Sequence, residues 1–252
     1  MSTTRGQIVT FYSYKGGTGR SMALANIACL LARRYSVLAI DWDLEAPGLH
    51  RFFRPLLKER FPLNESGEFE LNRHPGLINL FTEIEKSISE DRPVLNQSVV
   101  KNLFSQNQLE RYILKTSINR LSILKAGSFD DTYSNLINSF PWNSLFERAP
   151  WLYLAFGQQL ARRYDFVLID SRTGLTDTSG ICTMLMPDRL VTVFTPNFQS
   201  SSGVLDIVRR AVSFRRSTDD LRPLIVFPLV SRIDPTRSVA ERSWGLEIQR
   251  NV

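Results

Sequence analysis

A glycine-rich loop with the sequence YKGGTGRS occupies residues 14–21, between an apolar run at residues 8–12 and a helical pattern that begins at Arg20. Where a strand, a glycine loop and a helix follow each other, backbone N–H groups and the positive end of the helix can surround phosphate oxygens. Lys15 and Arg20 add positive charge, and Ser21 adds a hydroxyl that can bind a metal ion. A glycine turn without a ligand is the alternative interpretation. The position of the loop and its two cations favour a phosphate-binding site.

Carboxylates that could serve such a site follow two apolar runs. Asp41 and Asp43 come at the end of residues 37–40, a run typical of a strand covered on both faces. Alternation along an extended chain puts these two carboxylates on one side, so both can face the phosphate end of a sheet. Asp170 directly follows residues 166–169, where a carboxylate can hold magnesium through water. The sequence therefore predicts several carboxylates near one phosphate loop.

The loop departs from the standard pattern G-x-x-x-x-G-K-[ST], because Tyr14 stands at the first glycine and Arg20 at the lysine. An extra lysine, Lys15, follows Tyr14. These residues resemble the deviant Walker A motif, K-G-G-x-G-K-[ST], of the ParA/MinD family of P-loop ATPases, and most closely its bacterial K-G-G-x-G-R variants. The resemblance extends over most of the chain through further motifs. It implies that Lys15 reaches across a dimer to the partner's nucleotide and takes part in catalysis.

The same resemblance implies that the loop binds ATP. The expected nucleotide contacts are Gly16, Gly17, Thr18, Gly19, Arg20, Ser21 and Met22. Met22 lacks the hydroxyl that many relatives use on the α-phosphate. Arginine keeps the positive charge of the usual lysine, but its planar fork cannot copy a compact ammonium that sits between phosphates. We therefore expect ATP hydrolysis to be slow.

The segment DWDLEAPGL, residues 41–49, resembles the family's switch I, which carries a D-x-D pattern. The resemblance implies that Asp43 orients or activates the attacking water and contributes to the metal site. It implies that Asp41 supports the metal and the local network, so both carboxylates are candidate catalytic residues. An isolated D-x-D would more often be a solvated strand end.

The segment DSRTG, residues 170–174, resembles switch II, which is usually D-x-P-x-G. Asp170 then corresponds to the Walker B aspartate and would hold magnesium together with Ser21. Arg172 stands in place of the usual proline. It could touch the nucleotide, a partner subunit or a carboxylate, and the sequence leaves these three open.

Two polar loops, at residues 195–197 and 231–234, follow later apolar runs. Ligands of open α/β folds bind at this carboxyl edge of the sheet, and the resemblance places these loops around the base. Pro196, Ser231 and Arg232 are the candidate contacts. Ordinary polar turns are the alternative.

A dinucleotide-binding fold competes with this interpretation, because residues 17–19 could begin G-x-G-x-x-G and Asp41 lies at a suitable distance to bind a ribose. The third glycine position is Met22, a bulky side chain where the helix must pack closely. Together with the two cations of the loop, this argues against NAD.

The order of elements predicts an α/β fold with a mostly parallel twisted sheet and helices on both faces. The expected strands are residues 8–12, 37–40, 121–124, 166–169, 190–194 and 224–230. The expected helices start at Arg20 or span residues 77–88, 152–163 and 204–216, with a weaker pattern at 94–114. We assign residues 1–252 to one domain, with a core at residues 6–49 and 119–235 and a helical elaboration at about 50–118. The end of the chain lacks a convincing final strand, so we expect the chain to be the N-terminal part of a longer protein.

Composition sets broad limits. The chain has 252 residues, 43% of them hydrophobic, and a net charge of +6. That charge would suit polyanions, but the basic residues occur mostly as scattered pairs that fit a solvated surface better. Cys29 and Cys182 suggest neither a disulfide nor a zinc site, and His50 and His74 are interpreted as solvated loop residues. With neither a secretory signal nor an apolar run long enough to span a bilayer, we expect a cytoplasmic protein without stable membrane insertion.

These features together predict an ATP- and magnesium-dependent switch that forms a homodimer across the nucleotide and hydrolyses ATP to control a partner protein or a fused effector domain. Two alternatives remain open at this point. One is a nucleotide-binding scaffold without useful turnover. The other is a partition or positioning ATPase of the ParA type that binds DNA non-specifically through its basic surface.

Overall fold

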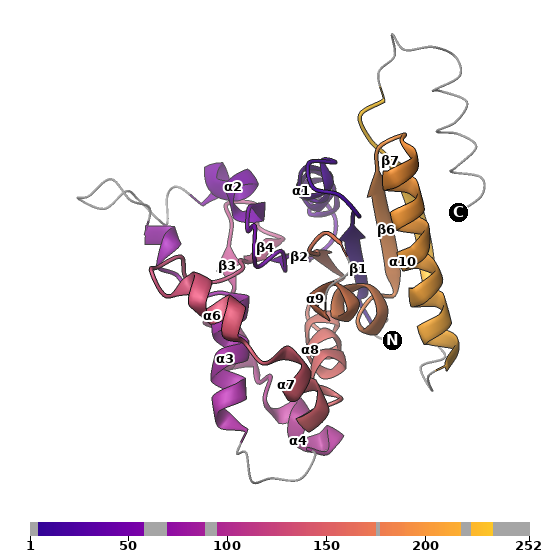
Figure 1. Ribbon diagram of the computed structural model, residues 1–252. Helices are drawn as coiled ribbons and strands as arrows, with labels where there is room; N and C mark the ends of the chain where they lie inside the picture. The colour runs from indigo at the N-terminus through magenta and orange to yellow at the C-terminus, as the bar shows by residue number, and fades with distance from the viewer. Residues whose placement is uncertain (1–4, 58–69, 89–94, 175–176, 218–222, 234–252) are drawn as a thin grey trace.

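The computed structural model describes residues 5–57, 70–88, 95–174, 177–217 and 223–233. These residues form a seven-stranded sheet in the order β3-β4-β2-β5-β1-β6-β7, with helices on both faces (Figure 1). The predicted α/β class with a mostly parallel sheet is confirmed. The loops at the carboxyl ends of neighbouring strands therefore meet at one edge.

Six strands run parallel and one runs antiparallel at the edge. The parallel strands are β1 (Gln7–Tyr12), β2 (Val37–Asp41), β4 (Leu121–Leu124), β5 (Phe166–Asp170), β6 (Arg189–Phe194) and β7 (Ile225–Val230). The antiparallel strand is β3 (Leu114–Lys115), which pairs with β4. Because Asp41 of β2 lies in register with Asp170 of β5, the two carboxylates end neighbouring strands at the same height.

One face of the sheet is covered by α1 (Arg20–Leu31) and α2 (Leu49–Phe53), followed by the 3-10 helix η1 (Arg54–Leu56). Successive side chains of a strand point to opposite faces of the sheet, so alternate residues pack into two separate apolar cores. Val9 and Phe11 pack with Leu24 of α1, whereas Ile8 packs on the opposite face with Phe156, which belongs to α8 (Leu152–Ala161). The sheet is thus buried on both sides, which explains the continuous apolar runs of its strands.

The opposite face carries a thick helical layer. Its elements are α3 (Leu77–Ser87), α4 (Gln97–Asn102), α5 (Gln106–Glu110), α6 (Tyr133–Ser139), α7 (Trp142–Arg148), α8 (Leu152–Ala161), α9 (Asp177–Gly180), the π-helix η3 (Ile181–Leu185) and α10 (Phe198–Ser217). The 3-10 helix η2 (Glu70–Asn72) instead packs Leu71 into the apolar cluster of α1 and α2. Many buried residues of this layer join one apolar cluster with Trp42 and Leu44 of the chain after β2. The layer therefore packs directly beneath the segment that resembles switch I.

The structure departs from the sequence prediction in several places. The weak helical pattern at residues 94–114 divides into α4, α5 and the start of β3, and α10 begins at Phe198 rather than near residue 204. The helical layer also includes α6 and α7, beyond the elaboration expected at about residues 50–118. Asp234 and the tail at residues 238–252 lie outside the described residues.

Candidate functional site

The glycine loop connects β1 to α1 and forms the wall of a cavity of about 440 Å³. Gly17 and Gly19 have φ angles of 72° and 87°, a backbone region that side chains other than glycine rarely adopt. Gly19 is also the N-cap of α1 and contributes no side-chain cap. The lining residues come from the loop, from the chain after β2 and from the chain after β5: Ser13, Gly16, Gly17, Thr18, Gly19, Arg20, Ser21, Met22, Asp43, Glu45, Ala46, Phe52, Arg172 and Thr173.

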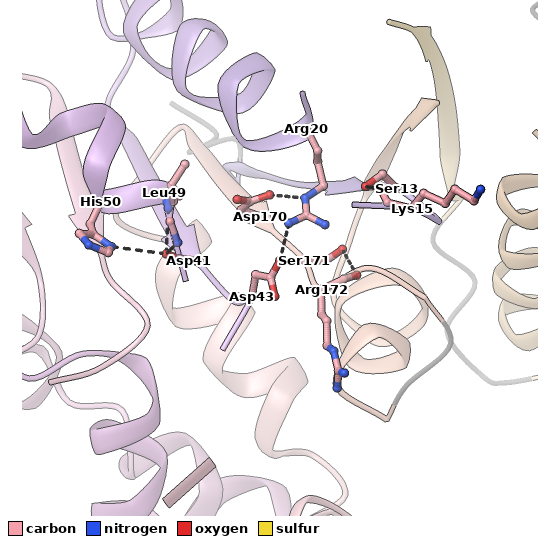
Figure 2. Close-up of polar contacts among 11 residues, drawn as sticks. Ser13, Lys15, Arg20, Asp41, Asp43, Leu49, His50, Asp170, Ser171 and Arg172 are labelled. Atoms are coloured by element: carbon pink, nitrogen blue, oxygen red, sulfur yellow. Dashed lines mark hydrogen bonds and ion pairs between the residues drawn. The ribbon is translucent and has the colours of Figure 1, made fainter. Parts of the chain in front are cut away.

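Arg20 lines this cavity and contacts two carboxylates (Figure 2). Its Nε donates to Asp170 Oδ1 at 2.5 Å, and its Nη2 donates to Asp43 Oδ2 at 2.8 Å. The residue is only 6% exposed. Burial alone would lower its pKa, but the nearby charges of Asp170 and Asp43 raise the pKa of Arg20, so the guanidinium remains positive. One buried cation thus joins the P-loop to both segments that resemble switches.

Two polar atoms of the loop are buried without a hydrogen-bond partner, namely Thr18 Oγ1 and Arg20 Nη1. Buried polar atoms are normally paired, because an unpaired donor or acceptor loses its water without compensation. Both residues line the cavity. A ligand with several oxygen acceptors would satisfy the Arg20 donor and could bond the Thr18 hydroxyl.

Asp170 ends β5 and is 1% exposed. Burial raises the pKa of its carboxyl to about 6; Arg20 opposes this shift, Asp41 adds to it, and a side-chain hydrogen bond with Ser21 opposes it. The Ser21 hydroxyl and the Asp170 carboxylate are therefore adjacent. No group of three or more His, Cys, Asp or Glu side chains in the described part of the chain could hold a metal alone. Magnesium would fit here as a hard cation that takes Ser21, Asp170 through water, and oxygens of a phosphate ligand.

Asp41 does not line the cavity. Its carboxylate is fully buried, and Oδ2 accepts hydrogen bonds from the backbone nitrogens of Gly48 at 3.1 Å and Leu49 at 3.0 Å. His50 Nδ1 lies 3.9 Å from the same oxygen. The interpretation of His50 as a solvated residue was wrong, because its ring is buried against Phe129 with centroids 4.9 Å apart. Asp41 thereby holds the chain at Gly48 and Leu49 against the end of β2.

Arg172 contacts a carboxylate, which is one of the three partners left open by the sequence. Its Nη1 forms an ion pair with Glu45 Oε1, and both residues line the cavity. This pair joins the segment after β5 to the segment after β2. Glu45 was not predicted as a site residue, although its place two residues after Asp43 was a usable signal.

Lys15 is half-buried and is not among the residues that line the cavity. Figure 2 shows its side chain extending away from Arg20 and the carboxylates. Its carbonyl accepts a hydrogen bond from Ser13 Oγ at 3.0 Å, which stabilises the start of the loop. Lys15 therefore does not act on its own phosphate cavity in this arrangement.

The loops expected around the base are not part of the phosphate cavity. Neither Pro196 nor Ser231 belongs to the described lining residues. Asn197 Oδ1 accepts from the Ser200 nitrogen at 2.9 Å, and the Ser231 nitrogen donates to the Phe194 carbonyl at 2.8 Å, so both have local structural roles. Arg232 is closer to the P-loop, since its Nη2 lies 3.8 Å from the place that a Cβ on Gly17 would take.

The cavity has an apolar rim that was not predicted from the sequence. Met22 of α1 is 54% exposed and Phe52 of α2 is 47% exposed, and both line the cavity. Met22 was identified as a nucleotide contact, but Phe52 was not, because it lies outside the motifs that mark the site in the sequence. A second cavity, of about 1120 Å³, lies next to the first, and Glu45 and Ala46 line both cavities. The switch I segment thus separates two cavities.

A known protein family matches most of the chain. The model of this family, described as the CobQ/CobB/MinD/ParA nucleotide binding domain and called CbiA, matches residues 9–249. No curated protein matches the chain at a significant level. Among the described residues, no helix combines the length and the apolar character that crossing a membrane requires.

Solved structures share the fold at low sequence identity. A plasmid partition protein from Borrelia burgdorferi has a TM-score of 0.58 at 20% identity, covering 99% of this chain and 87% of that chain. The ATP complex of a McdA variant from Cyanothece has a TM-score of 0.60 at 15% identity, covering 98% and 80%. The cell division ATPase MinD from Pyrococcus furiosus has a TM-score of 0.55 at 20% identity, covering 97% and 80%.

Proposed function

Because the chain belongs to the CobQ/CobB/MinD/ParA nucleotide-binding family, we propose that it is an ATP- and magnesium-dependent switch that dimerises on ATP and hydrolyses it slowly. The observation that carries this proposal is the P-loop cavity with its buried, unpartnered donor on Arg20 and its unpartnered hydroxyl on Thr18. Solved relatives support ATP as the ligand, since one is described as an ATP complex and another as bound to AMPPNP.

The phosphates would be held by the amides of residues 16–21 and by the Arg20 guanidinium. Backbone amides at a helix N-terminus suit phosphate because several N–H groups converge on one point. Ser21, and Asp170 through water, would hold magnesium with Asp43 nearby, and the metal would neutralise charge that develops on the phosphate oxygens. Positioning and charge neutralisation carry phosphoryl transfer, so the site needs no covalent nucleophile.

Asp43 is the residue that would orient the attacking water. Asp43 lines the cavity and is 9% exposed as a residue, so its carboxylate can face a ligand without being fully solvated. Asp41 would act through position alone, by fixing Gly48 and Leu49 and therefore the shape of the segment that carries Asp43. In this proposal Asp41 is a positioning residue.

Lys15 would act on the nucleotide of a second subunit. The support is that Lys15 belongs to the glycine loop, is not among the residues that line its cavity, and points away from its own carboxylate cluster. The apolar rim of Met22 and Phe52 would lie near the same contact and lose exposed apolar surface on dimerisation. The nucleotide would thereby decide whether a surface for a protein partner forms from the two switch segments.

The test uses two substitutions with matched controls. Lys15→Ala should abolish dimerisation driven by a non-hydrolysable ATP analogue, measured by light scattering after size exclusion, while the exposed Lys86→Ala should leave it unchanged. Asp43→Ala should lower the single-turnover rate of phosphate release by about 100-fold or more, while Asp206→Ala should not. Normal dimerisation of the first variant, or normal turnover of the second, would refute these roles.

A scaffold that binds nucleotide without useful turnover is the second candidate. It is favoured by one specific observation, the ion pairs that hold Arg20 against Asp43 and Asp170. Single-turnover phosphate release separates the two functions, because a scaffold would bind ATP and yield no phosphate above the background rate.

A further inference from the structure

The position of Arg20 has a consequence for metal binding. The side edge of its guanidinium, made of Nε and Nη2, contacts Asp170 Oδ1 and Asp43 Oδ2 together. Figure 2 shows the three side chains converging between the P-loop and the two switch segments. The oxygens in these contacts belong to the carboxylates that a metal in this cavity would need. In this arrangement a cation of the protein already occupies them.

A planar guanidinium is suited to this bridge because its donors form a rigid fork, and one side edge can reach two acceptors. Buried carboxylates strongly require a counter-charge, since an unpaired charge in a low-dielectric site is costly. Asp170 is 1% exposed, and Asp41 adds a third negative charge nearby. Arg20 therefore compensates a cluster of negative charge that would otherwise attract a divalent cation.

The remaining guanidinium nitrogen is free for a different acceptor. Arg20 Nη1 is buried and has no hydrogen-bond partner, and Arg20 is one of the residues that line the cavity. A phosphate oxygen could bond Nη1 first, while Nε and Nη2 still hold the carboxylates. Further phosphate oxygens would then compete with Asp43 and Asp170 for the other two nitrogens.

We propose that Arg20 is a lock on the metal site, which keeps Asp43 and Asp170 bound to the protein's own cation until a triphosphate draws the guanidinium away. This regulation rests on the proposed nucleotide site. The two carboxylates become available to a metal only when the triphosphate has bound, so a divalent cation without nucleotide binds weakly. Asp43 is likewise kept from a catalytic water in the nucleotide-free protein. A lysine at this position would lack the fork that spans both carboxylates.

The first test measures Mn²⁺ binding to the nucleotide-free protein by electron paramagnetic resonance, with Mn²⁺ standing in for Mg²⁺. Wild type should bind Mn²⁺ weakly, and Arg20→Lys should bind it on the order of tenfold more tightly, since one bridging ion pair no longer competes. Adding Asp170→Asn to Arg20→Lys should remove the gain. Arg148→Lys, which alters an arginine–glutamate pair in the helical layer, is the matched control and should behave as wild type.

Equal Mn²⁺ affinity of wild type and folded Arg20→Lys would overturn the lock. A second measurement keeps the proposal falsifiable if that variant does not fold. In the wild-type protein labelled with ¹⁵N-arginine, saturation with AMPPNP in the absence of metal should shift the Arg20 Nε–H resonance. An unchanged resonance while the nucleotide is bound would contradict the lock.

Failure of the Arg20 lock can be distinguished from failure of the proposed nucleotide binding. AMPPNP binding by wild type is measured in the same samples by calorimetry. If AMPPNP does not bind, the nucleotide function and the release step both fail, and the Mn²⁺ comparison alone shows whether Arg20 excludes a cation.

Discussion

The edge of the sheet at the P-loop and the helical layer below it stabilise the protein in different ways (Figure 1). At the P-loop edge, four buried charged residues, Arg20, Asp41, Asp43 and Asp170, are held by ion pairs and backbone hydrogen bonds. In the helical layer, aromatic rings make up much of the contact surface. Phe81 of α3 alone contacts Trp42, Trp142, Tyr153 and Phe156 at centroid distances of 5.4–5.7 Å.

The difference indicates where stability and chemistry reside. Burying an aromatic ring is favourable whether or not a charged group lies beside it. A buried charge, by contrast, is tolerated only when it is paired. A phosphate ligand can rearrange the second kind of contact but not the first. We therefore expect substitutions in the helical layer to change the free energy of unfolding, and substitutions at the P-loop edge to change binding and turnover more than stability.

The largest stability effect is expected for Phe81→Ala. Removing a fully buried ring that packs against four aromatic neighbours should lower the free energy of unfolding by about 3–5 kcal/mol, measured by urea denaturation. Nucleotide affinity of the folded protein should stay within about twofold, since Phe81 does not line the P-loop cavity.

Phe198→Ala is the control for this prediction, because its ring is 76% exposed. Its free energy of unfolding should change by less than about 0.5 kcal/mol. A similar loss for both variants would show that the aromatic cluster is not a main source of stability.

A smaller, pH-dependent effect is expected for Lys125, which lies at the end of β4 between the two regions. Its ammonium is fully buried, donates to the carbonyls of Asn72 at 3.1 Å and Gly127 at 2.6 Å, and lies 4.3 Å from the Phe129 ring centroid. Burial lowers the pKa of Lys125 to about 7 from an ordinary value of 10.5, and Asp41 and Asp130 oppose the shift.

Between these two pKa values the unfolded chain binds a proton that the folded chain has released, so stability rises with pH. This gain in the free energy of unfolding is complete above the unfolded pKa, and it is lost as pH falls from the unfolded pKa to the folded pKa. From pH 7 to 9 the free energy of unfolding of wild type should increase by about 1–2 kcal/mol relative to Lys125→Met. Parallel pH profiles of the two proteins, from denaturation at several pH values, would disprove the role of this lysine.

The smallest effect on stability is expected for the pair between Arg172 and Glu45. Their side chains are 29% and 46% exposed, and solvent screens such pairs. Glu45→Gln should change the free energy of unfolding by less than about 1 kcal/mol, measured by thermal denaturation. A loss above about 2 kcal/mol would show that this link between the switch segments is a main structural contact.

Much of the fold could be predicted because its signals are local. The apolar runs that became β2, β4 and β5 are buried on both faces, so the run itself marks the strand. The two-residue β3 carries no such signal, since it exists through pairing with β4. Residues 94–114 were predicted poorly because the short helices α4 and α5 are stabilised by packing rather than by their own periodicity.

The site was predictable as a set of positions but not as a set of contacts. Spacing in the sequence placed Arg20, Asp43 and Asp170 near one edge of the sheet. It could not show that Arg20 would bridge the two carboxylates, because that depends on side chains from segments about 150 residues apart meeting at one point. The Glu45 partner of Arg172 was missed for the same reason.

Calorimetric titration with ATP in the presence of magnesium decides whether the glycine loop binds a triphosphate, with Gly17→Val as the matched variant. We expect saturable binding to wild type and its loss in Gly17→Val, because a β-branched residue does not tolerate the φ of 72° at this position. Absence of saturable binding of any nucleoside triphosphate to folded wild-type protein, or equal binding by both proteins, would contradict this role of the loop.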